Sequence, residues 1–147
     1  MTSTLVVDDH LLLRILPDDE PTSLRPASAA VATTGLWYHR LCRALAGGGV
    51  VGSMSRRLGN VDPAVAADVV ASVLNLPESI ELVSLRSLGW PMGELVHAGA
   101  RLNLPSLEAL ASARHLDAEI CLAEADGNVP LQLAAQEVGV PVRTIKE

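Results

Sequence analysis

The stretch LVVDDHLLLRIL, residues 5–16, decides how we expect the chain to fold. Three apolar residues run directly into two carboxylates, Asp8 and Asp9, and an apolar helical pattern then resumes. Residues that are apolar on both faces are typical of a central strand in a parallel sheet, which is covered on both sides. The stretch therefore predicts a buried strand over 4–8, acids at its carboxyl end, and a short helix over 10–16.

Strand and helix patterns alternate along the rest of the chain, whereas the segment 50–61 gives no clear pattern. Alternation of this kind favours a parallel sheet covered by helices on both faces. We expect an α/β fold: a three-layer α/β/α sandwich with a central parallel sheet of four to five strands, in a single domain over 1–147. The further strands are predicted over 80–85, 118–123 and 140–145, with a short one at AVAT (30–33), and the helices over 35–45, 62–74, 91–103, 104–116 and 129–139.

The composition limits the classes of function and the compartment. The net charge of −6 leaves no general basic surface for nucleic acid, so any RNA contact would need a local patch such as the SRR at 55–57. No apolar run approaches the roughly 18 residues of a membrane span. The first apolar run has no basic residues before it and carries acids, unlike a signal peptide. We expect a cytoplasmic protein without membrane contact.

Cysteine and histidine give no metal-binding pattern. Cys42 and Cys121 lie far apart in apolar surroundings and have neither CxxC nor Cys/His ligand spacing, so they are expected to be buried free thiols. His10, His97 and His115 have no spacing typical of a zinc site. The segment GGGVVG at 47–52 lacks the Lys-Ser/Thr of a phosphate-binding loop.

Acids gather where strands are predicted to end. In open parallel sheets, ligands bind outside the carboxyl ends of the strands. Clustered carboxylates repel each other unless a cation neutralises them, and Mg²⁺ or Mn²⁺ suits ligands that are all oxygen. Such acids can instead be solvated or cap a helix, which is the alternative for Asp9. The acids that strand ends and facing helices would bring together are Asp8, Asp9, Glu108, Glu124 and Asp126.

The order of elements resembles the PIN domain, a nuclease fold found in the toxin half of many bacterial toxin–antitoxin pairs. LVVDDHLLLRIL looks like the first strand, catalytic aspartate and first helix of that family. LPSLEALASARHLDAEICLAEADGNVPLQLAAQEVGVPVRTI, residues 104–145, is similar to its last helix–strand–helix–strand portion. The resemblance implies a Mg²⁺- or Mn²⁺-dependent ribonuclease with an antitoxin or other protein partner, in which Asp8, Glu108 and Asp126 hold the metal and activate water.

The match of the acids to the family is incomplete near the end of the chain. Asp126 best matches the acid after the fourth strand, Glu124 is the alternative, and Asn128 could assist. Glu108 stands where the family has an aspartate, but counting back from DAEICL places Ser106 there instead.

The family's remaining acid lies on the helix predicted over 35–45, where this chain has His39 or Arg40. Two hypotheses follow: a ribonuclease, or a catalytically degenerate PIN-like module without a metal that binds RNA or a protein partner. His39 and Arg40 could bind a phosphate or a base together with neighbouring aromatics. Alternatively, Trp37 and Leu41 pack inward and the residues between them lie at the surface.

Self-association is expected from the apolar character of the surface. The helix predicted over 62–74 is rich in Ala and Val, and the mean hydropathy of the chain is +0.31. Exposed apolar surface of this kind marks contact sites between proteins. We therefore expect a homodimer or a bound partner helix.

Overall fold

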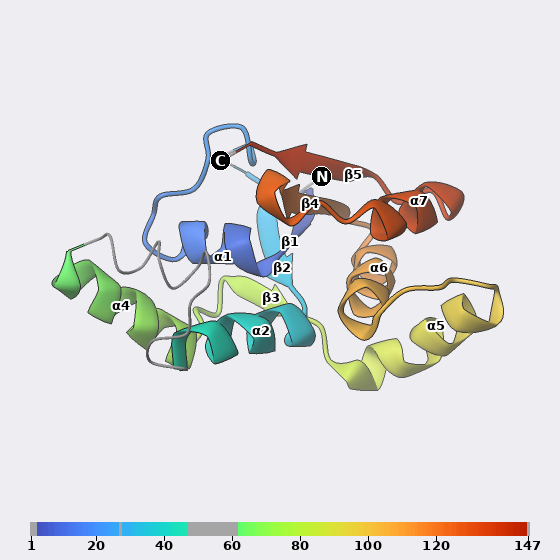
Figure 1. Ribbon diagram of the computed structural model, residues 1–147, viewed down its shortest axis with the longest axis horizontal. Helices are drawn as coiled ribbons and strands as arrows, with labels where there is room; N and C mark the ends of the chain where they lie inside the picture. Colours follow the sequence, from blue (N-terminus) through green and yellow to red (C-terminus); the bar gives the residue numbers. More distant parts are fainter. Residues whose placement is uncertain (1–2, 27, 47–61, 147) are drawn as a thin grey trace.

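This computed structural model describes residues 3–26, 28–46 and 62–146. The predictions about GGGVVG and SRR fall outside these residues, as does the side chain of Asp126. The fold is a five-stranded parallel sheet between two layers of helices (Figure 1), which confirms the predicted α/β class and includes AVAT as a strand. The strands are β1 (Thr4–Val7), β2 (Ala30–Thr33), β3 (Ile80–Leu82), β4 (Glu119–Ala123) and β5 (Val142–Ile145).

The helices of the described residues alternate with these strands. They are α1 (Asp9–Ile15), α2 (Gly35–Ala46), α4 (Pro63–Leu74), α5 (Leu85–His97), α6 (Leu104–Leu116) and α7 (Val129–Glu137), and a 3₁₀ turn, η1 (Glu124–Asp126), follows β4. None of these helices has the length and apolar character needed to cross a membrane, within the described part of the chain.

Side chains that alternate along the strands divide the core into two halves. Val6 and Ile120 point to the face covered by α5, α6 and α7, whereas Leu5, Val7 and Cys121 point to the face covered by α1 and α4. This two-residue period is the normal pattern of a strand with both faces buried. The core therefore lies on both sides of β1 and β4, the central strands of the molecule.

Helix α2 belongs to both halves of the core. Its Trp37 packs with the α5–α6–α7 side and its Leu41 with the α1–α4 side. The helix contacts α1, α4 and α6 and begins just after the end of β2. This position brings α2 to the carboxyl edge of the sheet.

In the strand order β3-β2-β1-β4-β5, the direction in which successive strands are added reverses between β1 and β4. After β1 the chain builds outward through β2 and β3, then returns to the other side of β1 as β4. In open parallel sheets, the crevice outside such a switch point is the usual ligand site. Asp8 directly follows β1, and η1, which contains Glu124 and Asp126, directly follows β4. Both segments therefore start at this switch point.

The sequence predicted both β3 and α5 but gave them the wrong bounds. We expected a strand over 80–85 and a helix from residue 91, but β3 ends at Leu82 and α5 begins at Leu85. The Ser84 side chain accepts a hydrogen bond from the Arg86 N–H and caps the helix, which then continues through Pro91. Three buried side chains on its inner face, Leu88, Met92 and Leu95, offset the hydrogen bond that proline removes.

Candidate functional site at the carboxyl edge of the sheet

The carboxylate of Asp8 is completely buried and joins three elements. Its Oδ1 accepts a hydrogen bond from the Leu11 N–H at 2.9 Å, so Asp8 is the N-cap of α1. Its Oδ2 accepts a hydrogen bond from the Ala123 N–H, also at 2.9 Å, at the end of β4. The Asp8 side chain therefore links the ends of β1 and β4 at the switch point and holds the start of α1.

Burial makes ionisation of Asp8 unfavourable. Desolvation raises its pKa from 3.8 to about 6, although the hydrogen bonds from Leu11 and Ala123 act in the opposite direction. The charge of Asp9 raises the pKa further and His10 lowers it. Near neutral pH, Asp8 is thus a carboxylate whose negative charge the fold tolerates rather than favours.

Asp9 is paired with Arg40, which with His39 is one of the two residues that stand where the resemblance implies an acid. The Nε of Arg40 lies 2.6 Å from Oδ2 of Asp9, and its Nη2 lies 2.7 Å from Oδ1. The Asp9 side chain has no exposed surface, whereas that of Arg40 is 38% exposed. Two parallel hydrogen bonds of this kind are the strongest form of Arg–carboxylate contact. Capping of α1, the alternative considered for Asp9, is therefore wrong, and Asp9 instead joins α1 to α2.

Glu108 lies on α6 and is buried against the start of α2. Its Oε1 accepts a hydrogen bond from the Leu36 N–H at 2.7 Å. A Cβ at Gly35 would lie 3.5 Å from Oε2, so the carboxylate fits closely over the helix terminus. Together with Thr34 Oγ1, which accepts a hydrogen bond from the Trp37 N–H at 3.0 Å, Glu108 satisfies N–H groups that have no partner within α2.

Ser106, the alternative to Glu108 in the family comparison, has a different partner. The Asn128 Nδ2 donates a hydrogen bond to Ser106 Oγ at 2.9 Å, and the Asn128 Oδ1 accepts one from the Leu131 N–H at 3.2 Å. Asn128 thus caps α7 and ties it to α6. Ser106 and Glu108 are both buried near the start of α6, the first facing α7 and the second facing α2.

The other candidate residues are dispersed. Glu124 is exposed in η1, and only the backbone of Asp126 is described there. His39 is exposed on α2 and Trp37 and Leu41 are buried, as the surface alternative predicted, but Tyr38 and Arg40 between them are half-buried. Both described cysteines are free, but only Cys121 is fully buried, where desolvation raises its pKa to about 12. Cys42 is half-buried, so that part of the prediction was wrong.

The fit of these residues to Mg²⁺ or Mn²⁺ depends on how many potential ligands lie together and on what their oxygens already bind. Asp8 uses both carboxylate oxygens on backbone N–H groups, Asp9 uses both on Arg40, and Glu108 uses one on α2. Among the described side chains, no group of three or more His, Cys, Asp or Glu is placed to hold a metal ion. The described acids alone therefore do not fit a divalent-metal site.

Two roles at this edge were missed by sequence reasoning. We identified Arg40 as a cation in the place of an acid but not Asp9 as its partner, 31 residues earlier in the chain. The available signal was the two acids after β1 together with a basic residue on α2, the helix that follows the neighbouring strand β2. The hydrogen bond from the Leu36 N–H to Glu108 spans 72 residues and has no local signature.

Comparisons with known proteins do not assign the chain to a family. No protein-family model matches the chain, and no curated protein matches it. The likeness to the PIN domain therefore rests on the quoted motifs and remains a prediction.

Proposed function

We propose that the protein is a catalytically degenerate PIN-like module that acts by binding a protein partner. The observation that carries the proposal is the ion pair between Arg40 and the buried carboxylate of Asp9. It involves Arg40, which with His39 is one of the two residues for which the family resemblance implies a metal-binding acid. Because the charge of Asp9 is already balanced by Arg40, this acid has no net charge to offer a metal ion.

The hydrogen bonds of the remaining acids support the same proposal. Asp8 and Glu108 stabilise helix termini and a strand end, which gives each buried carboxylate a structural role. Buried carboxylates with backbone partners are costly to remove, so these acids are expected to be needed for stability even without catalysis.

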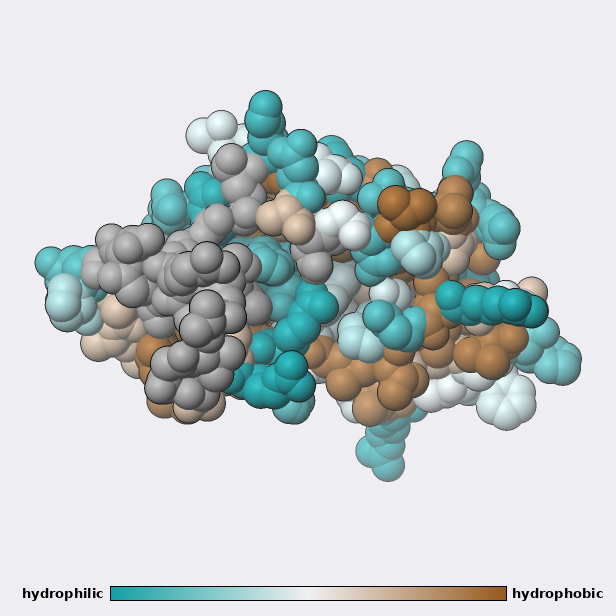
Figure 2. All heavy atoms as spheres, viewed as in Figure 1, coloured by the Kyte–Doolittle hydropathy of each residue, from teal (hydrophilic) through white to brown (hydrophobic). Residues whose placement is uncertain are grey.

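Charge and surface character favour a protein over RNA as the partner. The net charge of −6 opposes the approach of a polyanion. Apolar side chains gather on the surface over α5 and the beginning of α6 (Figure 2), where Trp90 and Leu104 are strongly exposed. Exposed apolar patches typically mark protein contacts. We place the module in the cytoplasm, with an antitoxin-like protein or a second copy as partner.

An RNA cleavage and binding experiment tests the proposal. Wild type and Asp8→Asn are incubated with a mixed RNA pool in Mn²⁺ and in chelator, and RNA binding is followed by fluorescence anisotropy. We expect neither protein to cleave RNA in a metal-dependent way and neither to bind it at physiological salt. Cleavage by wild type that chelator and Asp8→Asn both abolish would overturn the proposal.

A Mg²⁺- or Mn²⁺-dependent ribonuclease is the second candidate function. The observation that favours it is the burial of two acids, Asp8 and Glu108, near the carboxyl edge, with Asp126 in the turn after β4. In this alternative these three residues would hold the metal. The same cleavage experiment separates the two candidates, because only the ribonuclease depends on both Asp8 and the ion.

A further inference from the structure

The outer face of α5 carries large apolar side chains that are exposed to solvent. The helix packs on α6 through its inner face, formed by Leu88, Met92 and Leu95. On the opposite face, the Trp90 side chain is 80% exposed. A large aromatic side chain left in water contributes nothing to folding, but it contributes strongly to binding when it is covered.

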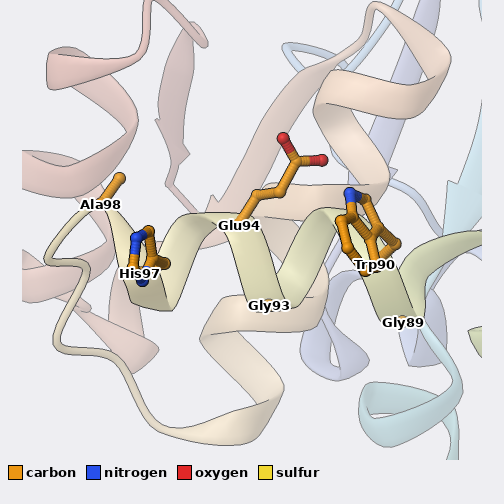
Figure 3. A pocket seen from close by; sticks show the side chains of 6 residues that line it. All are labelled: Gly89, Trp90, Gly93, Glu94, His97 and Ala98. Atoms are coloured by element: carbon orange, nitrogen blue, oxygen red, sulfur yellow. The ribbon is translucent and has the colours of Figure 1, made fainter.

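A hollow lies beside Trp90 on the same helix. Its volume is about 500 Å³, and it is lined by Gly89, Trp90, Gly93, Glu94, His97 and Ala98. A Cβ at Gly89 or Gly93 would meet nothing within 4 Å, so the two glycines leave the backbone open. Figure 3 shows the side chains of Trp90 and His97 on either side of Gly93 along the helix. A projecting ring and a depression that could receive one thus occupy the same surface.

We propose that a second copy of this chain binds here, with its own α5 antiparallel to the first about a two-fold axis at Trp90. In a two-fold interface each surface must complement itself, since the same residues face each other from both sides. One α5 supplies both the projecting ring and the hollow. The Trp90 rings of the two copies would pack against each other and over the glycines.

The charges on α5 specify this arrangement. Arg86 and Glu94 are both exposed, and each is four residues from Trp90 in opposite directions. Residues four apart are neighbours on a helix surface, so the three side chains form one row. In the antiparallel pair centred on Trp90, Arg86 of each copy faces Glu94 of the other. Two Arg–Glu ion pairs would therefore flank the aromatic contact, one on each side. If the two helices were parallel instead, like charges would face each other.

This inference deepens the proposed function and rests on it, because it names the partner and the surface of a binding module. Two other occupants could cover the outer face of α5: an apolar helix of an unrelated protein, or a nucleic-acid base stacked on Trp90. Neither would need a positive and a negative side chain at equal distances on either side of the ring.

Charge reversal with rescue tests the interface. The full chain is studied by sedimentation equilibrium from micromolar to ~100 µM, a range that covers typical transient association. We expect wild type to dimerise. Arg86→Glu and Glu94→Arg should each raise the dimer dissociation constant about tenfold or more, because each creates two like-charge pairs. The double variant Arg86→Glu/Glu94→Arg should restore dimerisation, and Trp90→Ala should prevent it.

Controls separate this surface from other outcomes. Glu137→Arg, an exposed reversal at the end of α7, should leave the dissociation constant unchanged, and circular dichroism should show every variant folded. A monomeric wild type would overturn the inference. A dimer whose dissociation constant is the same in all α5 variants would also overturn it. Such self-association through another face would still agree with the proposed binding function. Loss of RNA binding in Trp90→Ala without any change in mass would also overturn it.

Discussion

The guanidinium of Arg40 on α2 forms two hydrogen bonds with the buried carboxylate of Asp9 on α1, at 2.6 Å and 2.7 Å. Asp9 is the second residue after the end of β1, so this contact lies beside the switch point of the sheet. The positive charge of Arg40 and the negative charge of Asp9 therefore balance each other at this edge of the sheet. The stability of the pair and the properties of its neighbours can each be tested.

Removing the cation of this pair should destabilise the fold. Arg40→Met leaves the Asp9 carboxylate buried without its charge partner. This should lower the free energy of unfolding by about 3 kcal/mol. The value is at the low end for a buried ion pair because Arg40 is partly exposed. Urea unfolding measures this value. Arg43→Met, an exposed change one turn later on α2, is the matched control and should cost less than about 0.5 kcal/mol.

The double variant Asp9→Asn/Arg40→Met refines the same test. Removing both charges leaves no unpaired ion in the core, so most of the lost stability should return. A double variant as unstable as Arg40→Met alone would show that Arg40 stabilises the fold through packing and other contacts rather than through Asp9.

Replacing Glu108 should separate its role as a hydrogen-bond acceptor from its charge. Glu108→Ala removes the acceptor for the Leu36 N–H and should cost about 2–3 kcal/mol, since a buried donor loses a charged partner. Glu108→Gln keeps an acceptor oxygen and should cost about 1 kcal/mol. Thermal unfolding of both variants checks the order. Equal losses would contradict the assignment of Glu108 to the α2 terminus.

A buried hydroxyl on α6 offers a substitution that should stabilise the protein. Among the described residues, the Oγ of Ser112 is buried without any hydrogen-bond partner. Ser112→Ala removes this desolvated group and improves helix propensity, so the free energy of unfolding should rise by about 1 kcal/mol. Ser106→Ala is the matched control: that serine accepts a hydrogen bond from Asn128, so its loss should cost about 1 kcal/mol.

The raised pKa of Asp8 predicts a specific dependence of stability on pH. The group binds its proton more tightly in the folded state, with a pKa of about 6 against 3.8 in the unfolded chain. Its favourable contribution is therefore complete below pH 3.8 and is lost as the pH rises through about 6. The difference in pKa corresponds to at most about 3 kcal/mol.

The comparison of wild type with Asp8→Asn isolates this contribution from that of other acids. The free energy of unfolding of wild type, measured relative to the variant, should fall between about pH 4 and pH 6 and then remain constant. Unfolding in urea at a series of pH values provides the curve. A relative stability that instead rises with pH over this range would mean that the fold favours the ionised carboxylate.

The sequence predicted well what depends on local patterns. The run LVV followed by acids identified a central strand with Asp8 at its carboxyl end, because a strand buried on both faces has a distinctive composition. The start of α5 was missed because Pro91 resembled a first helical residue, whereas the effective signal was the cap at Ser84.

The candidate site was less predictable than the fold, since its contacts join distant segments. The Arg40–Asp9 pair depends on α2 crossing the edge of the sheet beside α1, which no local pattern encodes. In the same way, the Asp8 hydrogen bond to the Ala123 N–H spans 115 residues. The sequence placed Asp8 and Asp9 at this edge, but only the packing of the helices showed which residues face each other.

The most direct test of the central claim is the effect of Mn²⁺ on unfolding of the wild-type protein. An ion that binds only the folded state stabilises it, by about 2.7 kcal/mol at 100 times its dissociation constant. Because the described acids are engaged with Arg40 and with backbone N–H groups, we predict the same unfolding midpoint in urea with Mn²⁺ up to millimolar concentrations as with chelator. A saturable rise in the midpoint that disappears in Asp8→Asn would contradict the account and favour a metal-dependent ribonuclease.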